Sequence, residues 1–263
     1  MMTIDALPHH LERMILIQAD RETVFRFFTD NARWASWWGA GSTIDARPGG
    51  RVLIRHPGDV EVSGEVVEIA PPDRLVFTYG FTSGSPIPPG GSLVTIQLEE
   101  AGTSTRLHLS HDFAEADVRD EHVQGWRYQL SLFGNVVVDE VNAGAGDAVD
   151  VWFAAWSETD ASTRESMLAR VASSDVRLRD RFSLIDGLAD LIPHLTAAQR
   201  FMHGLTLQRE GDVRHCQGTV LADWVARAAD GQERGRGTNV FVFNGKGVIE
   251  SVTGFWGAPK PRT

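Results

Sequence analysis

The chain has 263 residues, of which 42% are hydrophobic, and it carries a formal net charge of −10. This length accommodates one large domain or two ordinary ones, and the apolar content is sufficient for buried cores. The negative charge argues against nucleic acid and anionic membrane surfaces as partners, because both need a basic face on the protein.

The remaining bulk features point to a soluble protein of the cytoplasm. The single cysteine, Cys216, excludes an internal disulfide and fits a reducing compartment. No apolar run approaches the roughly 20 residues of a membrane span, and the N-terminus lacks a signal-peptide pattern. The sequence contains no GxGxxG, GxxxxGK, HExxH or GxSxG motif. We therefore expect no cofactor.

The first half of the chain predicts one strand, two short helices, six strands and one long helix. Asp20 and the residues after it predict the first short helix, and a second follows at about 31–36. The strands are expected at 13–19, 42–45, 51–56, 60–69, 74–80, 92–100 and 104–112, separated by glycine and proline turns. This order predicts a curved antiparallel sheet that grips a C-terminal helix.

The long helix, at about 121–142, organises this half. Its apolar residues recur at steps of three and four and so share one stripe: Val123, Trp126, Leu130, Phe133, Val137 and Val141. Glu121, Arg127, Gln129 and Asp139 are expected to face water. We expect the stripe to pack across the sheet, with a cavity between helix and sheet.

Four motifs in this half carry a family resemblance: FTDNARWASWWGAGSTIDARPGGRV, GEVVEIAPPDRLVFTYGF, TRLHLSHDF and HVQGW. Together they resemble the bacterial relatives of the heat-shock-protein-90 ATPase activator, which belong to the START-like, or SRPBCC, helix-grip superfamily. The resemblance covers residues 11–141 and implies a helix-grip fold that binds an apolar ligand in its cavity or acts as a binding module. The family shares no catalytic set that could be carried over.

We expect four residues near this cavity: Trp38, Tyr79, His111 and Trp126. The alternative is that they are ordinary core and rim residues, because aromatic side chains usually serve packing. His108 and His111 are three apart on a strand, so they point to opposite faces and do not suit a shared metal ion. No metal site is expected.

The second half begins after a small-residue linker at 142–146, which predicts domains at 1–143 and 147–263. Helices are expected at 147–157, 162–172 and 188–202. Strands are expected at 176–180, 204–210, 213–228, 237–243 and 248–256, with a turn at Gly211-Asp212. Helices followed by a long-stranded meander predict an α+β cone with a bent antiparallel sheet.

The motifs DVWFAAWSETD, SSDVRLRD and GTNVFVFNGKGVIESVTGFW give this half a resemblance of its own. They resemble the nuclear transport factor 2-like superfamily, which includes SnoaL-like cyclases and ketosteroid isomerases. The resemblance places Asp180 at the position of the isomerases' general base and Asn239 at that of their second acidic residue. Trp152 stands where the isomerases have a tyrosine donor, which argues against a steroid isomerase.

Two further residues are candidates for the pocket of the cone. Trp224 is expected to wall Asp180 together with Trp152 and Phe182. His215 lies on the predicted strand 213–228 and shares a face with other polar residues by alternation. That face either lines the pocket or meets solvent, and both readings stay open.

The leading hypothesis is that the protein binds a small apolar ligand in the helix-grip cavity. One alternative is a cofactor-independent isomerase- or cyclase-type enzyme that uses Asp180 for proton transfer. Another is a chaperone-ATPase partner that uses the surface of the first domain. A homodimer formed through the sheet of the second half is a further expectation.

Overall fold

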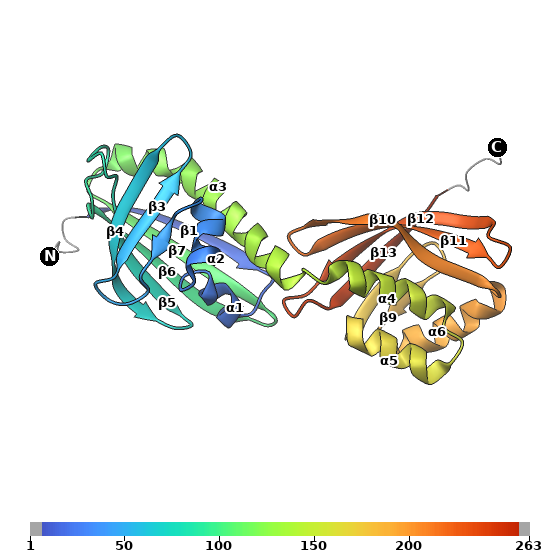
Figure 1. The fold of residues 1–263 in the computed structure, drawn as a ribbon. Coiled ribbons are helices and arrows are strands. Elements are labelled where there is room, and N and C mark those ends of the chain that lie inside the picture. Colours follow the sequence, from blue (N-terminus) through green and yellow to red (C-terminus); the bar gives the residue numbers. More distant parts are fainter. Residues whose placement is uncertain (1–6, 258–263) are drawn as a thin grey trace. The chain divides into compact units, whose positions relative to one another are not determined.

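The structure is a computed structural model that describes residues 7–257 (Figure 1). The chain divides into two compact units, an N-terminal unit up to Val138 and a C-terminal unit from Asp139. Each unit combines helices with a sheet, so the predicted α+β class is confirmed. Among the described helices, none combines the length and the hydropathy that a bilayer crossing requires.

The N-terminal unit is built on a seven-stranded antiparallel sheet of order β1-β7-β6-β5-β4-β3-β2. Its strands are β1 (His9–Ile17), β2 (Thr43–Ile44), β3 (Arg51–His56), β4 (Val60–Ala70), β5 (Arg74–Tyr79), β6 (Ser92–Ala101) and β7 (Ser104–Phe113). Side chains alternate between buried and more exposed along β6 and β7, which identifies one face of the sheet as the core face. His111 is fully buried on that face while His108 is not, as their spacing predicts.

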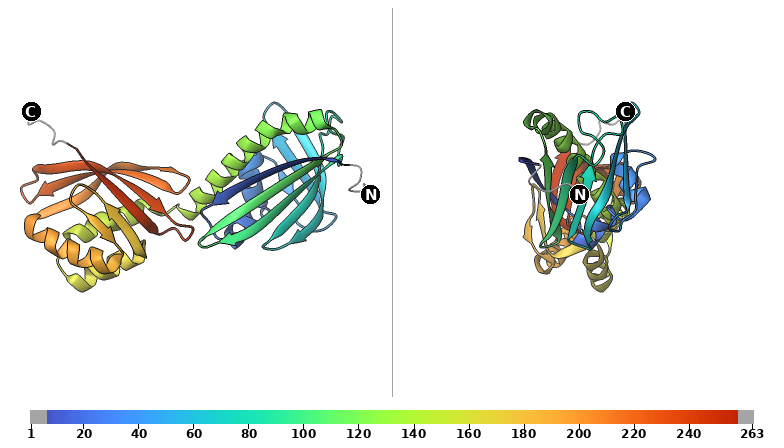
Figure 2. Two further views of the ribbon diagram at one scale, coloured as in Figure 1. Left: turned by 180° about the vertical axis from the view of Figure 1, so that it is seen from behind. Right: turned by 90° about the vertical axis from the view of Figure 1, so that its left-hand side faces the viewer.

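Three helices complete this unit: α1 (Arg21–Arg26), α2 (Asn31–Trp38) and α3 (Ala116–Val141). Asp20 and Asp30 begin α1 and α2 because each carboxylate accepts a hydrogen bond from a backbone N–H three residues later. Figure 2 shows α3, in light green, running diagonally across the face of the sheet.

The core of the N-terminal unit is strongly aromatic. Phe133 of α3 stacks on Phe28, with 5.2 Å between ring centroids, and meets Trp37 edge-on at 4.7 Å. Trp126, Leu130, Phe133 and Val137 of the predicted stripe are buried. One expectation is wrong: Gln129 is buried rather than exposed. Its amide donates a hydrogen bond to the backbone carbonyl of Trp37, which satisfies the buried polar group and ties α3 to α2.

The C-terminal unit places three helices on one face of a six-stranded sheet of order β10-β11-β12-β13-β8-β9. The helices are α4 (Ala145–Ser157), α5 (Ala161–Val171) and α6 (Leu188–Phe201). The strands are β8 (Ala172–Arg179), β9 (Leu184–Asp186), β10 (Leu205–Cys216), β11 (Thr219–Ala228), β12 (Glu233–Phe243) and β13 (Ile249–Gly257). The sheet is antiparallel except where β13 pairs with β8 in parallel, so it is a mixed sheet.

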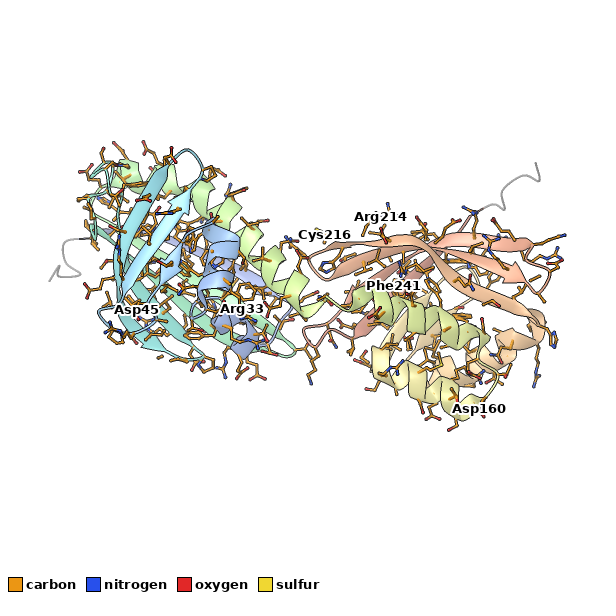
Figure 3. The ribbon with its side chains drawn as sticks, in the orientation of Figure 1. Arg33, Asp45, Asp160, Arg214, Cys216 and Phe241 are labelled. Atoms are coloured by element: carbon orange, nitrogen blue, oxygen red, sulfur yellow. The ribbon has the colours of Figure 1, made fainter. Side chains whose placement is uncertain are left out.

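The core of this unit lies between the helices and the sheet. Phe241, labelled in Figure 3, meets Trp152 and Phe153 of α4 edge-on, at 6.1 and 5.9 Å between ring centroids. Residues of every helix and of five strands contribute to this core, since alternate side chains of the long strands point toward the helices.

The predicted single strand at 213–228 is wrong, because the chain turns back within it. Gln217 and Gly218 adopt φ of 46° and 79°, the left-handed values of a two-residue hairpin, and this turn separates β10 from β11. The predicted turn at Gly211-Asp212 lies instead inside β10, where the pairing register with β11 shifts as in a β-bulge.

Candidate functional site

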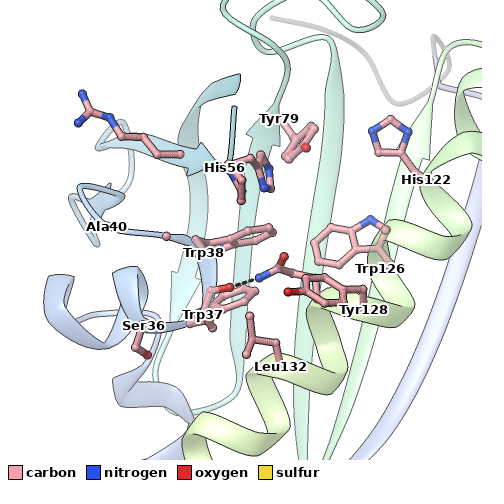
Figure 4. A pocket seen from close by; sticks show the side chains of 15 residues that line it. Ser36, Trp37, Trp38, Ala40, His56, Tyr79, His122, Trp126, Tyr128 and Leu132 are labelled. Carbon is pink, nitrogen blue, oxygen red and sulfur yellow. Dashed lines mark hydrogen bonds between the residues drawn. The ribbon is translucent and has the colours of Figure 1, made fainter. Parts of the chain in front are cut away.

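A pocket of about 550 Å³ lies in the N-terminal unit between α3, the C-terminal end of α2 and the ends of β3 and β5 (Figure 4). We call it the helix–sheet pocket. Its walls are largely aromatic or apolar, and its lining residues are Ser36, Trp37, Trp38, Gly39, Ala40, Arg55, His56, Pro57, Tyr79, His122, Gly125, Trp126, Tyr128, Gln129 and Leu132. The volume is sufficient for a small organic ligand.

Indole rings from two helices meet in the wall of this pocket. The rings of Trp38 on α2 and Trp126 on α3 meet edge-on, with 5.7 Å between their centroids. Trp37 lies against Trp38 at 4.2 Å. Gln129 spans the same two helices through its hydrogen bond to the Trp37 carbonyl, drawn as a dashed line in Figure 4.

Behind Trp126, a buried chain of hydrogen bonds fixes the wall of the pocket. The Trp126 indole Nε1–H donates to His111 Nδ1 at 3.0 Å, and His111 Nε2 lies 2.8 Å from the Ser92 hydroxyl. Ser92 in turn donates to the Tyr79 backbone carbonyl at 2.9 Å. Because the Ser92 hydroxyl donates its hydrogen to that carbonyl, it can only accept a hydrogen bond from His111 Nε2–H. The imidazole is therefore the neutral Nε2–H tautomer. Burial, with the nearby His122, holds the pKa of His111 well below its ordinary 6.5, in agreement with this assignment.

Three polar groups open into the pocket rather than into this chain. The Tyr79 side chain is only 5% exposed, yet its hydroxyl has no hydrogen-bond partner among the described residues. His122 donates from Nδ1 to the Val118 carbonyl at 2.7 Å, which leaves Nε2 as an acceptor. His56 meets Trp38 edge-on at 5.7 Å and makes no hydrogen bond through its ring to another described residue.

Burial shapes the ionisation of these groups. It raises the pKa of Tyr79 above its ordinary value. Burial and the neighbouring His122 lower the pKa of His56 below 6.5. Burial also lowers the pKa of His122, opposed by its bond to the Val118 carbonyl and by Glu121. All three groups are therefore neutral at neutral pH.

The structure brings three of the four predicted residues, Trp38, Tyr79 and Trp126, to the wall of the pocket. His111 lies behind that wall, fully buried. Sequence reasoning missed His56 and His122. His122 lies four residues before Trp126, a spacing that places both on one face of a helix, so the sequence did contain a signal for it.

In the C-terminal unit, Asp180, Asn239 and Trp224 lie close together around Gly254. A methyl group built on Gly254 would lie 3.2 Å from Asn239 Oδ1 and 3.7 Å from Asp180 Oδ2. The Trp224 indole donates to Asn239 Oδ1 at 3.0 Å, which leaves the Asn239 amide N–H groups unused. Asp180 caps a turn, since its Oδ1 accepts from the Phe182 N–H at 2.7 Å and its own N–H donates to the Ser183 carbonyl.

The other two predicted residues of this unit lie away from that group. Trp152 is fully buried in the core against Phe241. His215 is near the end of β10, where its Nδ1 lies 2.6 Å from the Asp139 carboxylate and its Nε2 accepts from the Gly218 N–H at 3.0 Å. Within residues 7–257, no group of three or more His, Cys, Asp or Glu side chains is arranged to hold a metal ion.

Comparison with known proteins matches residues 18–137 to the family described as activator of Hsp90 ATPase homolog 1-like protein. This confirms the resemblance stated for the first half of the chain. The match covers less than half of the chain, and a search of curated proteins found no match.

Three similar solved structures represent both resemblances. A putative isomerase of the SnoaL-like family from Agrobacterium tumefaciens is 22% identical, over 43% of this chain and 96% of its own, with a TM-score of 0.41. The Aha1 dimer from Colwellia psychrerythraea is 18% identical, over 46% and 90%, with a TM-score of 0.41. An HSP90 activator from Plasmodium falciparum is 22% identical, over 45% and 87%, with a TM-score of 0.38.

Proposed function

We propose that this protein binds a small, largely apolar ligand in the helix–sheet pocket. One observation carries the proposal: the Tyr79 hydroxyl opens into a pocket of about 550 Å³ with indole walls and pairs with no described residue. A ligand that replaces water at this hydroxyl has to supply a polar atom to it, because a buried hydroxyl without a partner costs about 1–3 kcal/mol.

The pocket has the composition of a binding site rather than of a packing defect. Its walls provide apolar and aromatic area, and its few polar groups converge from three elements, β3, β5 and α3. Binding sites for small molecules combine these two features, because apolar area supplies affinity and a few polar groups set orientation. The buried hydrogen-bond chain behind Trp126 holds the wall in place before a ligand arrives.

Gly125 offers a direct way to block the pocket. It lines the pocket on α3, and a Cβ built on it meets no atom within 4 Å. The Gly125→Trp variant should therefore fill the pocket without disturbing the helix backbone. The probe is naphthalene, titrated into 15N-labelled protein while the indole N–H resonances are followed.

The resonances of Trp38 and Trp126 should shift with naphthalene in the natural protein and stay fixed in Gly125→Trp. Gly134→Ala is the matched control: it lies on the same helix outside the pocket, and its Cβ makes only an ordinary contact with Ile15 at 3.8 Å. Equal shifts in Gly125→Trp and the natural protein would show that naphthalene binds elsewhere and would contradict the proposal.

We infer a second candidate function, cofactor-independent proton transfer at Asp180, from the neighbourhood of Asp180 and Asn239. A carboxylate beside an amide with unused N–H groups can take a proton while the amide stabilises the oxyanion that forms. The test is deuterium uptake by the enolisable ketone 2-tetralone. Acceleration by the protein that disappears in Asp180→Asn would support it. No acceleration over buffer, together with a lower melting temperature of Asp180→Asn, would leave Asp180 as the cap of its turn.

The family description of residues 18–137 supports a third candidate, a partner of a chaperone ATPase. Its test is addition of the full chain to an Hsp90-type ATPase. Stimulation that persists in Gly125→Trp would assign this function to the surface of the N-terminal unit rather than to the pocket. No stimulation would dismiss it.

A further inference from the structure

The hydrogen-bonding state of His122 indicates what kind of ligand atom fits in the helix–sheet pocket. A carbonyl only accepts, so the bond to the Val118 carbonyl requires the hydrogen of neutral His122 to be on Nδ1. The other nitrogen, Nε2, then carries a lone pair and has no partner among the described residues. A ligand that replaces water beside Nε2 can supply a donor to it.

Tyr79 lies beside this acceptor. Its ring meets that of His122 edge-on, with 6.0 Å between centroids, and Figure 4 shows the Tyr79 hydroxyl directed into the space between α3 and the strands. A hydroxyl both donates and accepts. The pair of groups therefore fits an atom that donates one hydrogen bond and accepts another, which is the property of a hydroxyl.

The charges at the pocket favour a neutral ligand. Arg55 is the one lining residue with a permanent charge, and its guanidinium Nε lies 2.9 Å from Glu61. No carboxylate side chain belongs to the lining. A ligand anion would find no unpaired cation here at neutral pH, and a ligand cation would find no anion.

The shape and chemistry of the walls favour a flat aromatic ring. Trp38 of α2 and Trp126 of α3 meet in the lining of the pocket, and Trp37 adds a third indole. Aromatic rings gain edge-to-face and offset-stacking contacts with such walls in addition to the area they bury.

We propose that the ligand is a neutral aromatic compound with a hydroxyl group, which donates to His122 Nε2 and accepts from the Tyr79 hydroxyl. This rests on the proposed function and narrows it to a ligand class. His122 and Tyr79 are then the two groups that determine specificity, and the indole walls supply the affinity.

The test compares the affinities of four probes for the full chain by calorimetry at neutral pH: 2-naphthol, 2-methoxynaphthalene, naphthalene and 2-naphthoate. The methoxy compound accepts but does not donate. Since one hydrogen bond contributes about 0.5–1.5 kcal/mol, 2-naphthol should bind about two- to tenfold more tightly than 2-methoxynaphthalene. His122→Phe should abolish this difference. His108→Phe, on the opposite face of the sheet, should keep it.

Tyr79→Phe separates the second hydrogen bond from the first. The variant removes a hydroxyl that has no protein partner, so its melting temperature should not fall. It should weaken 2-naphthol and 2-methoxynaphthalene by a similar factor and leave naphthalene unchanged. This comparison keeps the proposal testable even where His122→Phe does not fold.

Equal affinities for 2-naphthol and 2-methoxynaphthalene, or no effect of Tyr79→Phe on either, would overturn the proposal and leave a purely apolar site. Tighter binding of 2-naphthoate than of 2-naphthol would overturn it in favour of an anion site. In both cases the proposed function stands as long as Gly125→Trp abolishes binding. If no probe binds, the proposed function fails as well.

Discussion

Trp126 is the residue on which the helix–sheet pocket most depends. Its ring is 4% exposed, meets Trp38 at 5.7 Å, and donates to the buried His111. Trp126→Ala should lower the free energy of unfolding by about 3–5 kcal/mol, because it leaves a large cavity and an unpaired His111 Nδ1. Denaturant unfolding measures this loss. A loss below about 1 kcal/mol is typical of surface positions and would place the ring outside the core.

The histidines of the pocket predict how the stability of the N-terminal unit depends on pH. The folded pKa values of His56, His111 and His122 are lowered, with burial as the largest cause in each case. The ordinary pKa of histidine is 6.5, so below pH 6.5 these histidines take up protons in the unfolded chain but not in the folded unit. The contribution of these residues to the free energy of unfolding is therefore fully present above pH 6.5 and is lost as the pH falls toward their lowered pKa values.

Thermal unfolding at a series of pH values tests this dependence. The melting temperature should fall as the pH drops below 6.5, and His111→Gln should make the fall shallower because glutamine does not titrate. His10, whose pKa is raised by Asp112 and Glu12, acts in the opposite direction but is exposed. A melting temperature that is constant, or that rises with acidification, would contradict the account.

Among the individual residues of the pocket, the aromatic ones were predicted from the sequence better than the polar ones. Trp126 follows from its place in the helical stripe, and Trp38 and Tyr79 were expected near the cavity as aromatic residues. The open acceptor on His122 does not follow from the sequence, because it depends on which ring nitrogen the Val118 carbonyl engages. The exposure of the Tyr79 hydroxyl likewise depends on the packing of β3, β5 and α3 together.

Among the elements, α3 contains Gly125, which tests whether the helix is optimised for stability or for a pocket. Gly125 has open space at its Cβ, so Gly125→Ala should raise the free energy of unfolding by up to about 1 kcal/mol. Gly237 on β12 is the contrasting case. A Cβ there would lie 2.2 Å from the Phe255 carbonyl oxygen and 2.6 Å from the Trp224 ring. Gly237→Ala should therefore destabilise the C-terminal unit.

Chemical denaturation of the two variants checks this contrast. The two changes in stability should have opposite signs, since Gly125 borders a pocket and a Cβ on Gly237 would meet backbone and indole atoms. A clear loss of stability in Gly125→Ala would mean that the space beside α3 is filled by groups that this structure does not place there.

Element boundaries were predicted correctly where the hydrophobic periodicity is strong. They were predicted wrongly where the backbone conformation of single residues sets the boundary. The strand at 51–56 agrees with β3, and the helix at 147–157 differs from α4 only by two residues at its start. The hairpin between β10 and β11 was missed because Gln217 adopts a left-handed φ that glutamine seldom adopts. Gly211-Asp212 resembled the turn, but forms an irregularity within β10. The parallel pairing of β8 with β13 depends on long-range contacts that alternation does not reveal.

For the whole molecule, the prediction is that each unit folds on its own. Only residues 142–144 lie between α3 and α4, and Ala145 is already 4% exposed in the core of the C-terminal unit. Fragments 1–143 and 144–263 should each show one cooperative thermal transition by circular dichroism. Failure of both to fold, while the full chain folds, would contradict autonomous domains.

The homodimer through the C-terminal sheet also stays a prediction, for which sedimentation equilibrium of fragment 144–263 is the measurement.

The helix–sheet pocket is proposed as the ligand site of this chain. The most direct measurement is a set of intermolecular nuclear Overhauser effects between 2-naphthol and the isotope-labelled full chain. Contacts are expected from the ligand ring protons to the indole protons of Trp38 and Trp126 and to the Gly125 α-protons, and all of them should disappear in Gly125→Trp. Contacts to residues of the C-terminal unit alone, or contacts unchanged in Gly125→Trp, would contradict it.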